Sequence, residues 1–212
     1  MSTRGIYGFH INGTDKLAYN HSDSYPRVLG VTILSQLRAV QDWELVKERI
    51  ASLIAIRETR ELGNHADDFR VELRRHYPDL QYKSEPRDYY KLMAPLQGTL
   101  EPYLSGKLSF MATANEFIDD SLFCEWGYIA NLDTHLLEVY RGLQTEKLPE
   151  QSRYREGPDR MGYYSCRMVG GYKLDSLPTK SMFLKNTKVE NQPSAWNIRN
   201  GQNLIWQITL SD

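Results

Sequence analysis

The sequence predicts an α+β protein with a mainly antiparallel sheet, formed by N- and C-terminal strands, on which a central cluster of helices packs. Segments rich in β-formers lie towards both ends, and helical periodicity is concentrated between them. No regular alternation of strand and helix suggests a doubly wound fold. Because a chain of 212 residues can bury a sizeable core, we expect a single domain over residues 1–212.

The chain opens with a predicted β-hairpin. Residues 4–11 are rich in β-formers, Asn12-Gly13 is a strong turn signal, and residues 16–20 form the return strand. A helix is expected to begin at Pro26, with Asp23 or Ser24 near its N-cap. Apolar spacing predicts further helices over residues 43–57, capped by Asp42, and over residues 64–76.

The second half is predicted to return to strands. Proline and glycine break residues 77–120 into short pieces, which suggests an irregular insertion or lid with a helix over 87–96 and a helical turn over 115–119. Residues 124–131 and 136–140 should pair as a hairpin, and residues 144–160 read as an exposed loop. A strand over 161–172 is expected to bend or end at Gly170-Gly171. Residues 177–185 are ambiguous, and Asn200-Gly201 precedes a closing strand over 204–210.

Composition excludes several classes of protein. The formal charge is −1, from 26 basic and 27 acidic residues, whereas a duplex nucleic-acid binder usually carries a basic excess. No apolar stretch approaches the roughly 18 residues of a membrane span. The N-terminus has no apolar signal region, and Cys124 and Cys166 are expected to be buried free thiols. We therefore expect a soluble, cytoplasmic protein that acts on neither membranes nor duplex nucleic acid.

The strongest candidate for a working site is the polar run of residues 19–26, which leaves the return strand and enters the first helix. Unpaired N–H groups at a helix N-terminus attract anions, and histidine changes charge near neutral pH. We therefore expect a pocket for a small anionic ligand, completed by an arginine and an aromatic ring from elsewhere. The expected ligand-binding residues are Tyr19, Asn20, His21, Ser22, Asp23, Ser24, Tyr25, Arg4 and Trp126.

Other interpretations of these residues stay open. The run is equally well explained as a turn and helix cap whose polar groups bond one another. His21, oriented by Asp23, could act as a general base. Against this, the neighbouring Ser22 would point to the opposite face of a strand, and the sequence contains no nucleophile elbow. No phosphate-binding glycine motif and no metal-ligand spacing is present, so no cofactor or metal is expected.

Trp126, Tyr128 and Tyr140 are a further group of interest. They are expected to form aromatic rungs across the hairpin of residues 124–140. Such a face can stack a base, although core packing is the commoner use.

Several segments at the two ends of the chain carry a family resemblance. They are Thr3-Arg4-Gly5, Gly8-Phe9, Asn12-Gly13, residues 19–26 and Leu29-Gly30, followed by residues 125–129, 131–133, 137–140 and 174–178. These segments resemble an uncharacterised family of proteins from bacteria, phages and prophages, and some fungi. More loosely, the opening is similar in layout to N-terminal-nucleophile hydrolases, in which Ser2 or Thr3 would have to become residue 1.

The family resemblance implies a phage- or prophage-type accessory protein. Its expected role is to sequester a small anionic ligand, for example a nucleotide-derived immune signal. One alternative is an inhibitor of a host defence or regulatory protein, which would use residues 77–120 or 144–160 as its contact surface. Another is a histidine-dependent hydrolase. Whether the protein is an enzyme, and whether it forms a homo-oligomer, is left open by the sequence.

Overall fold

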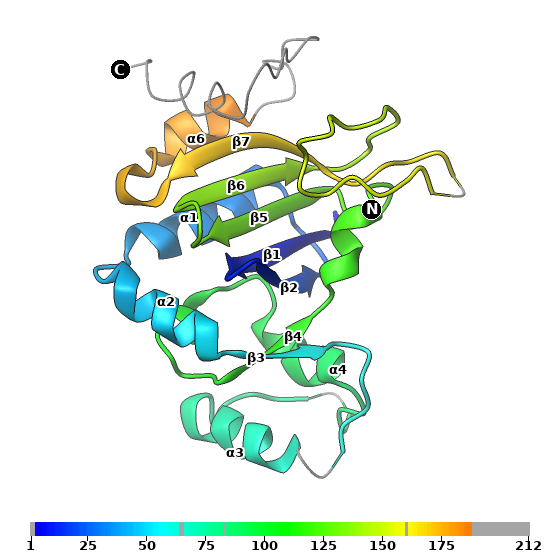
Figure 1. Ribbon diagram of the computed structural model, residues 1–212. Helices are drawn as coiled ribbons and strands as arrows, with labels where there is room; N and C mark the ends of the chain where they lie inside the picture. The colour runs from blue at the N-terminus through cyan, green and yellow to red at the C-terminus, as the bar shows by residue number, and fades with distance from the viewer. Residues whose placement is uncertain (1–2, 64–65, 83, 160, 188–212) are drawn as a thin grey trace.

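The computed structural model describes residues 3–63, 66–82, 84–159 and 161–187. A five-stranded sheet has the order β2-β1-β5-β6-β7, in which β1 and β5 are parallel and the other neighbours are antiparallel (Figure 1). Its strands come from both halves of the chain, so the predicted α+β class with a mainly antiparallel sheet is confirmed. They are β1 (Gly5–Ile11), β2 (Thr14–Asn20), β5 (Trp126–Asn131), β6 (Leu136–Arg141) and β7 (Arg167–Lys173).

The N-terminal hairpin forms as predicted. Asn12 and Gly13 have φ values of 52° and 69°, the left-handed conformation that a two-residue turn of type I′ requires at both positions. This turn fixes the register of β1 against β2, and it places His10 opposite Asp15.

The first helical segment differs from the prediction. A short π-helix, η1 (Pro26–Gly30), leads into α1 (Val31–Arg38), and its N-cap is Tyr25, which makes no side-chain capping bond. Asp23 and Ser24 therefore do not cap it. Ser24 points into the protein instead. Its N–H donates to the Thr3 carbonyl at 3.1 Å, and its side chain packs against Gly5, which has no side chain to obstruct it.

The second helix is shorter than expected. α2 (Trp43–Ser52) begins at the predicted cap, where the Asp42 carboxylate accepts the Leu45 N–H at 2.9 Å. The helix prediction is wrong beyond Ser52, because Leu53 is extended and the next residues form β3 (Ile54–Arg57), which pairs in parallel with β4 (Phe110–Thr113). Pairing with a distant strand thus overrides the helical apolar spacing of this segment.

The region from residue 77 to 120 contains more structure than predicted, and it packs into the main core. The expected helix is present as α4 (Tyr89–Met93) and η2 (Ala94–Leu96), and the expected helical turn as η3 (Asn115–Asp119); α5 (Glu101–Leu104) and β4 were not predicted. Side chains from this region, among them Tyr89, Tyr103 and Phe110, are buried in the same cluster as the sheet. The preceding helix, α3 (Ala66–His76), has the predicted end, while residues 64–65 lie outside the described part.

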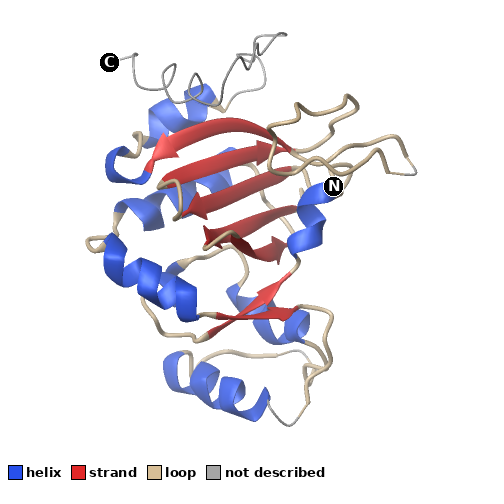
Figure 2. Ribbon diagram, viewed as in Figure 1, coloured by secondary structure: helices blue, strands red, loops and turns tan. Residues whose placement is uncertain are grey.

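The five-stranded sheet has two different faces. One face joins the helices in the main core, whereas the other, here the outer face, carries a smaller cluster that includes Ile6, Ile129 and Tyr154. Residues 144–166, here the 144–166 loop, contain no helix or strand among their described positions and supply Tyr154 to this outer cluster. Figure 2 shows the loop beside the sheet, away from α2 and α3.

The expected aromatic rungs do not form. Tyr128 is opposite Val139, and Tyr140 is opposite Gly127, so alternation of the strands places Tyr140 on the outer face. Trp126 and Tyr128 belong to the main core on the opposite face.

The last described elements partly match the prediction. β7 begins at Arg167, later than expected. It does not end at Gly170-Gly171, but its register against β6 is irregular just before Gly170. The ambiguous segment contains α6 (Lys180–Asn186), capped by Thr179. Cys124 and Cys166 lie just before β5 and β7 and are buried and free, as predicted. The predicted turn at residues 200–201 and strand over 204–210 lie outside the described residues. Within the described part, no helix combines the length and apolarity that a membrane crossing needs.

Candidate functional site

The polar run of residues 19–26 divides into an inner and an outer set of side chains. His21, Ser22 and Asp23 are exposed, whereas Asn20 and Ser24 are buried. The Asn20 Nδ2 donates to the Ser24 Oγ at 2.8 Å and to the Ser22 carbonyl. Asn20 and Ser24, two of the predicted binding residues, therefore stabilise the turn through their own hydrogen bonds. Because η1 has five residues and no side-chain cap, the anion site expected at a helix N-terminus gains no support from the structure.

The remaining predicted binding residues have other neighbours. The Tyr19 ring packs on Phe117 at 5.0 Å, between ring centroids, and it borders a cavity of about 10 Å³, room for about one water. Arg4 lies 4.9 Å from the Phe123 ring, and Arg141 lies 5.6 Å from the Trp126 ring. Tyr25 is half-buried, with the Arg27 guanidinium 5.9 Å from its ring. The run stays a prediction.

The small cavity beside Tyr19 also contains a carboxyl group with an unusual proton affinity. Burial, together with the nearby Asp88 and Glu116 carboxylates, raises the pKa of Glu58 to about 7. Glu58 and Tyr19 come from segments far apart in the sequence, so no sequence motif marks this pair.

A much larger cleft lies on the outer face, between β6, β7 and the 144–166 loop. Its volume is about 470 Å³, within the range of about 300–1,000 Å³ that is usual for small-molecule sites. The β5–β6 turn closes one end. The lining residues that can carry charge are His10, Asp133, Glu138, Arg153 and Arg167.

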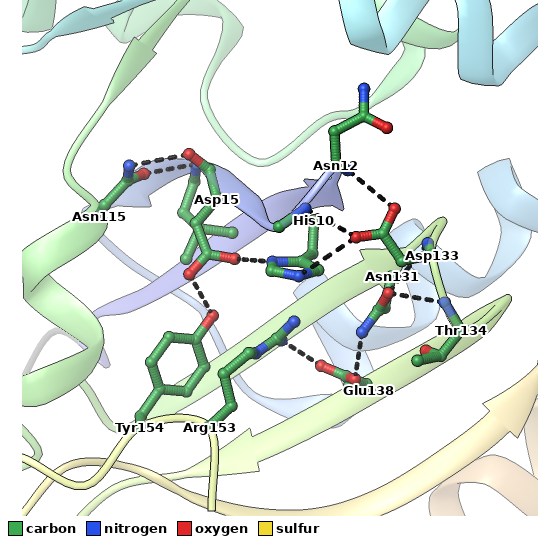
Figure 3. Close-up of polar contacts among 12 residues, drawn as sticks. His10, Asn12, Asp15, Asn115, Asn131, Asp133, Thr134, Glu138, Arg153 and Tyr154 are labelled. Atoms are coloured by element: carbon green, nitrogen blue, oxygen red, sulfur yellow. Dashed lines mark hydrogen bonds and ion pairs between the residues drawn. The ribbon is translucent and has the colours of Figure 1, made fainter.

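One hydrogen-bonded chain runs from His10 to the loop (Figure 3). The register of the N-terminal hairpin brings the His10 Nδ1 to within 2.6 Å of the Asp15 Oδ1, and the Tyr154 hydroxyl donates to the Asp15 Oδ2 at 2.8 Å. Burial raises the pKa of Tyr154, so its hydroxyl stays protonated and serves as a donor near neutral pH. The pair of His10 and Asp15 has the chemistry of an oriented histidine.

Glu138 forms the second polar centre, and its side chain is only 8% exposed. The Asn131 Nδ2 donates to the Glu138 Oε1 at 2.8 Å, and the Tyr140 hydroxyl donates to the Oε2 at 2.9 Å. The Arg153 Nη2 also donates to the Oε2, which completes a buried ion pair between β6 and the 144–166 loop. The carboxylate is compensated in charge and in hydrogen bonds, as a buried ion requires.

Asp133 ties together the two turns at the end of the cleft. Its carboxylate oxygens accept the Asn12 N–H at 2.8 Å and the Gly13 N–H at 2.9 Å, and these bonds, with His10 nearby, lower the pKa of Asp133. The Asp133 Oδ2 also lies 3.5 Å from the His10 Nε2. His10 thus stands between two carboxylates that are themselves held in place.

The carboxylates in and beside the cleft are already hydrogen-bonded. Each carboxylate oxygen of Asp15, Asp133 and Glu138 already accepts a hydrogen bond. The Nε and Nη1 of Arg153, by contrast, are buried without an acceptor among the described residues. Arg167 lies opposite Arg141 and beside Met168 of the outer cluster, so strand alternation directs its side chain to the other face of the sheet. Buried polar groups are nearly always paired, with protein, water or a ligand. Water or an anion against Arg153 would supply such an acceptor.

None of the predicted ligand-binding residues lines this cleft. One signal was available, because a two-residue turn at Asn12-Gly13 by itself implies that His10 faces Asp15. The contributions of Arg153 and Tyr154 had no comparable signal, since the path of a long loop cannot be read from its residues. Within the described residues, no cluster of three or more histidine, cysteine or acidic side chains is arranged to hold a metal ion.

Comparison with known proteins assigns no family to the chain. No protein-family model matches it, and no curated protein or solved structure shows significant similarity. The function must therefore be inferred from the chemistry of the cleft.

Proposed function

We propose that the protein binds a small anionic ligand in the cleft on the outer face of the sheet. The Arg153 guanidinium, which lines the cleft and has two nitrogens without an acceptor among the described residues, carries this proposal. Arginine is suited to carboxylate and phosphate groups because its donors are planar and its charge is permanent. Arg153 is also held in place by Glu138 and lies 4.9 Å from the Tyr154 ring, so little side-chain freedom remains to be lost on binding.

The biological setting is proposed from the sequence resemblance alone. A phage- or prophage-type accessory protein that holds an anionic ligand in such a cleft would act by sequestration, and a nucleotide-derived immune signal is one ligand of suitable charge. Inhibition of a host protein is the competing role. It predicts that no small anion binds.

Hydrolysis is a second candidate because His10 lines the same cleft and its Nδ1 lies 2.6 Å from the Asp15 Oδ1. An oriented histidine can remove a proton from water that attacks a bound ester. On this alternative, a phosphate ester is consumed by the wild type, and His10→Asn abolishes turnover while leaving the melting temperature within a few degrees. Binding without turnover refutes it and leaves the binding proposal intact.

Calorimetry and thermal-shift measurements with inorganic phosphate, AMP, GMP and cyclic di-AMP test the binding proposal. At least one of them should bind the wild type, and Arg153→Lys should weaken that binding about tenfold or more, through the loss of a charge-assisted hydrogen bond from the planar guanidinium. Lysine keeps a positive charge beside the buried Glu138, which Arg153 also compensates.

Arg155→Gln is the matched control. Arg155 lies on the same loop but is exposed and donates to the Glu150 carbonyl at 2.7 Å, so its removal should leave affinity unchanged. His21→Ala tests the polar run of residues 19–26 in the same assay. If affinity falls with His21→Ala and is unchanged with Arg153→Lys, the cleft is the wrong site. If none of the four compounds binds, the proposal is refuted.

A further inference from the structure

Cys124 and Cys166 form a pair of adjacent thiols beside the cleft on the outer face, here the outer cleft. They are the only cysteines of the chain, and they stand 42 residues apart in the sequence. The Cys166 Sγ donates to the Cys124 carbonyl oxygen at 3.2 Å, and the two thiols also share a hydrogen bond. Both residues belong to the outer cluster, where Cys124 is 0% and Cys166 1% exposed.

We propose that this pair is a redox-sensitive site, in which oxidation by a peroxide joins Cys124 to Cys166 and locks the 144–166 loop onto the sheet. Both are free thiols in the structure, which is therefore the reduced form. A disulfide requires two cysteines whose side chains already approach each other, and the contact between the two thiols meets that requirement. The proposal goes beyond anion binding and does not depend on it.

The two ends of the 144–166 loop meet at the segment that carries Cys124. At the start of the loop, the Gln144 N–H donates to the Ser121 Oγ at 3.1 Å. At its end, Cys166 contacts Cys124 through the hydrogen bonds described above. Hydrogen bonds of this kind open in local unfolding, whereas a covalent bond between the two sulfurs would hold the base of the loop closed.

The outer cleft gives a small oxidant a path to one of the two sulfurs. Cys166 is one of the residues that line the cleft, and Cys124 is not. Burial, together with the hydrogen bond to Cys166, raises the pKa of Cys124, so Cys124 stays a thiol and is the poorer first nucleophile.

The reaction has two steps. The Cys166 Sγ attacks one oxygen of hydrogen peroxide and breaks the O–O bond, which gives a sulfenic acid on Cys166 and one water. The Cys124 Sγ then displaces the hydroxyl of the sulfenic acid, and this hydroxyl leaves with the Cys124 proton as a second water. The two thiols lose two electrons and two protons in total, and the peroxide accepts both.

Thiol counting on the full-length chain tests the bridge. The native protein is treated with hydrogen peroxide, denatured and labelled with N-ethylmaleimide. We expect labelled thiols to fall from two to none in a monomeric chain and to return after dithiothreitol, because a thiol reduces a disulfide but not a sulfinic acid. With only two cysteines present, an intramolecular disulfide must join this pair. Persistent thiols, an irreversible loss or a disulfide-linked dimer would each refute the proposal.

The bridge should also stabilise the fold. Because it restricts the unfolded chain, we expect the melting temperature to rise by about 5–10 °C and hydrogen exchange of the loop amides to slow. The same sample after dithiothreitol is the matched control, since it keeps any oxidised methionine but loses the bridge. A melting temperature no higher than that of this control would overturn the locking of the loop.

Two single variants check the order of the steps. Cys124→Ala leaves the Cys166 sulfenic acid without a partner, so dimedone should trap it. Cys166→Ser keeps a donor for the Cys124 carbonyl and should leave Cys124 unmodified under the same treatment. Trapping in Cys166→Ser alone would contradict the assigned order. If either variant fails to fold, the thiol count and melting temperature of the wild type decide the proposal by themselves.

Discussion

Lys16 provides a sharp test of how the fold is held together. Its side chain leaves β2 towards the end of α2, where the ammonium group donates to the carbonyls of Ile50, Ala51 and Leu53 at 2.6, 3.0 and 2.7 Å. The residue is only 8% exposed. These carbonyls belong to the last turn of a helix, whose acceptors have no intrahelical partner and which favours a cation.

Lys16→Met removes the charge but keeps a similar shape. Three charge-assisted hydrogen bonds at about 1.5–3 kcal/mol each give a gross loss of roughly 5–9 kcal/mol. The variant no longer has to remove water from an ammonium ion, which costs several kcal/mol. Burial lowers the pKa of Lys16, which indicates that the wild type bears such a desolvation cost. We therefore expect the free energy of unfolding to fall by about 2–4 kcal/mol.

Urea denaturation followed by circular dichroism measures this change. Lys47→Met is the matched control, because Lys47 lies on α2 and pairs with the exposed Glu44 at 2.8 Å, so its loss should cost under about 0.5 kcal/mol. Hydrogen exchange of the β3 amides should accelerate in Lys16→Met, since the junction before β3 loses its anchor. A loss below about 1 kcal/mol, with β3 exchange unchanged, would show that water satisfies these carbonyls as well as the ammonium does.

Three further outcomes are expected. Arg153→Met leaves the Glu138 carboxylate buried without its partner and should lower the free energy of unfolding by about 3 kcal/mol. Adding Glu138→Gln to this variant should restore at least about 1 kcal/mol. Strictly additive losses of the two substitutions in urea denaturation would contradict the ion pair. Burial raises the pKa of Glu58 to about 7, so the folded protein binds this proton more tightly than the unfolded chain, and stability falls as pH rises from the ordinary carboxyl pKa to about 7. Because Glu58 is only half-buried, Glu58→Gln should relieve about 1 kcal/mol at pH 8 and nothing at pH 4; equal effects of the substitution at both pH values would exclude the shift. Gly5→Ala places a Cβ 2.4 Å from the Trp126 carbonyl oxygen and should cost about 2 kcal/mol, and a melting temperature equal to that of the wild type would show that the strands can separate there.

The sequence by itself determined the elements whose causes are local. The turn at Asn12-Gly13 needs two left-handed residues, so the first hairpin follows from the dipeptide, and its register already places His10 opposite Asp15. The cap at Asp42 is equally local, since a carboxylate three residues before Leu45 reaches its N–H. The α+β class follows from the segregation of helical and strand patterns along the chain.

Where local signals favoured two different structures, tertiary contacts determined which of them formed. The apolar spacing of α2 continues through Leu53 and Ile54, but pairing with β4 and the ammonium of Lys16 ends the helix at Ser52. The polar run of residues 19–26 looked like a site because its residue types suit one, yet Asn20 and Ser24 face inward and hold the turn. Residue type alone does not reveal which polar groups bond one another.

The outer cleft depended on tertiary structure most of all. It needs β1 beside β5, a parallel pairing across more than half of the chain, and a loop that brings Arg153 and Tyr154 onto Glu138 and Asp15. A loop without periodicity gives no information about its path. The unpaired nitrogens of Arg153 can be recognised only when every hydrogen-bond partner around it is known. Local chemistry therefore determined the strands and turns, while the charge balance that gives the cleft its proposed function arose only from their packing.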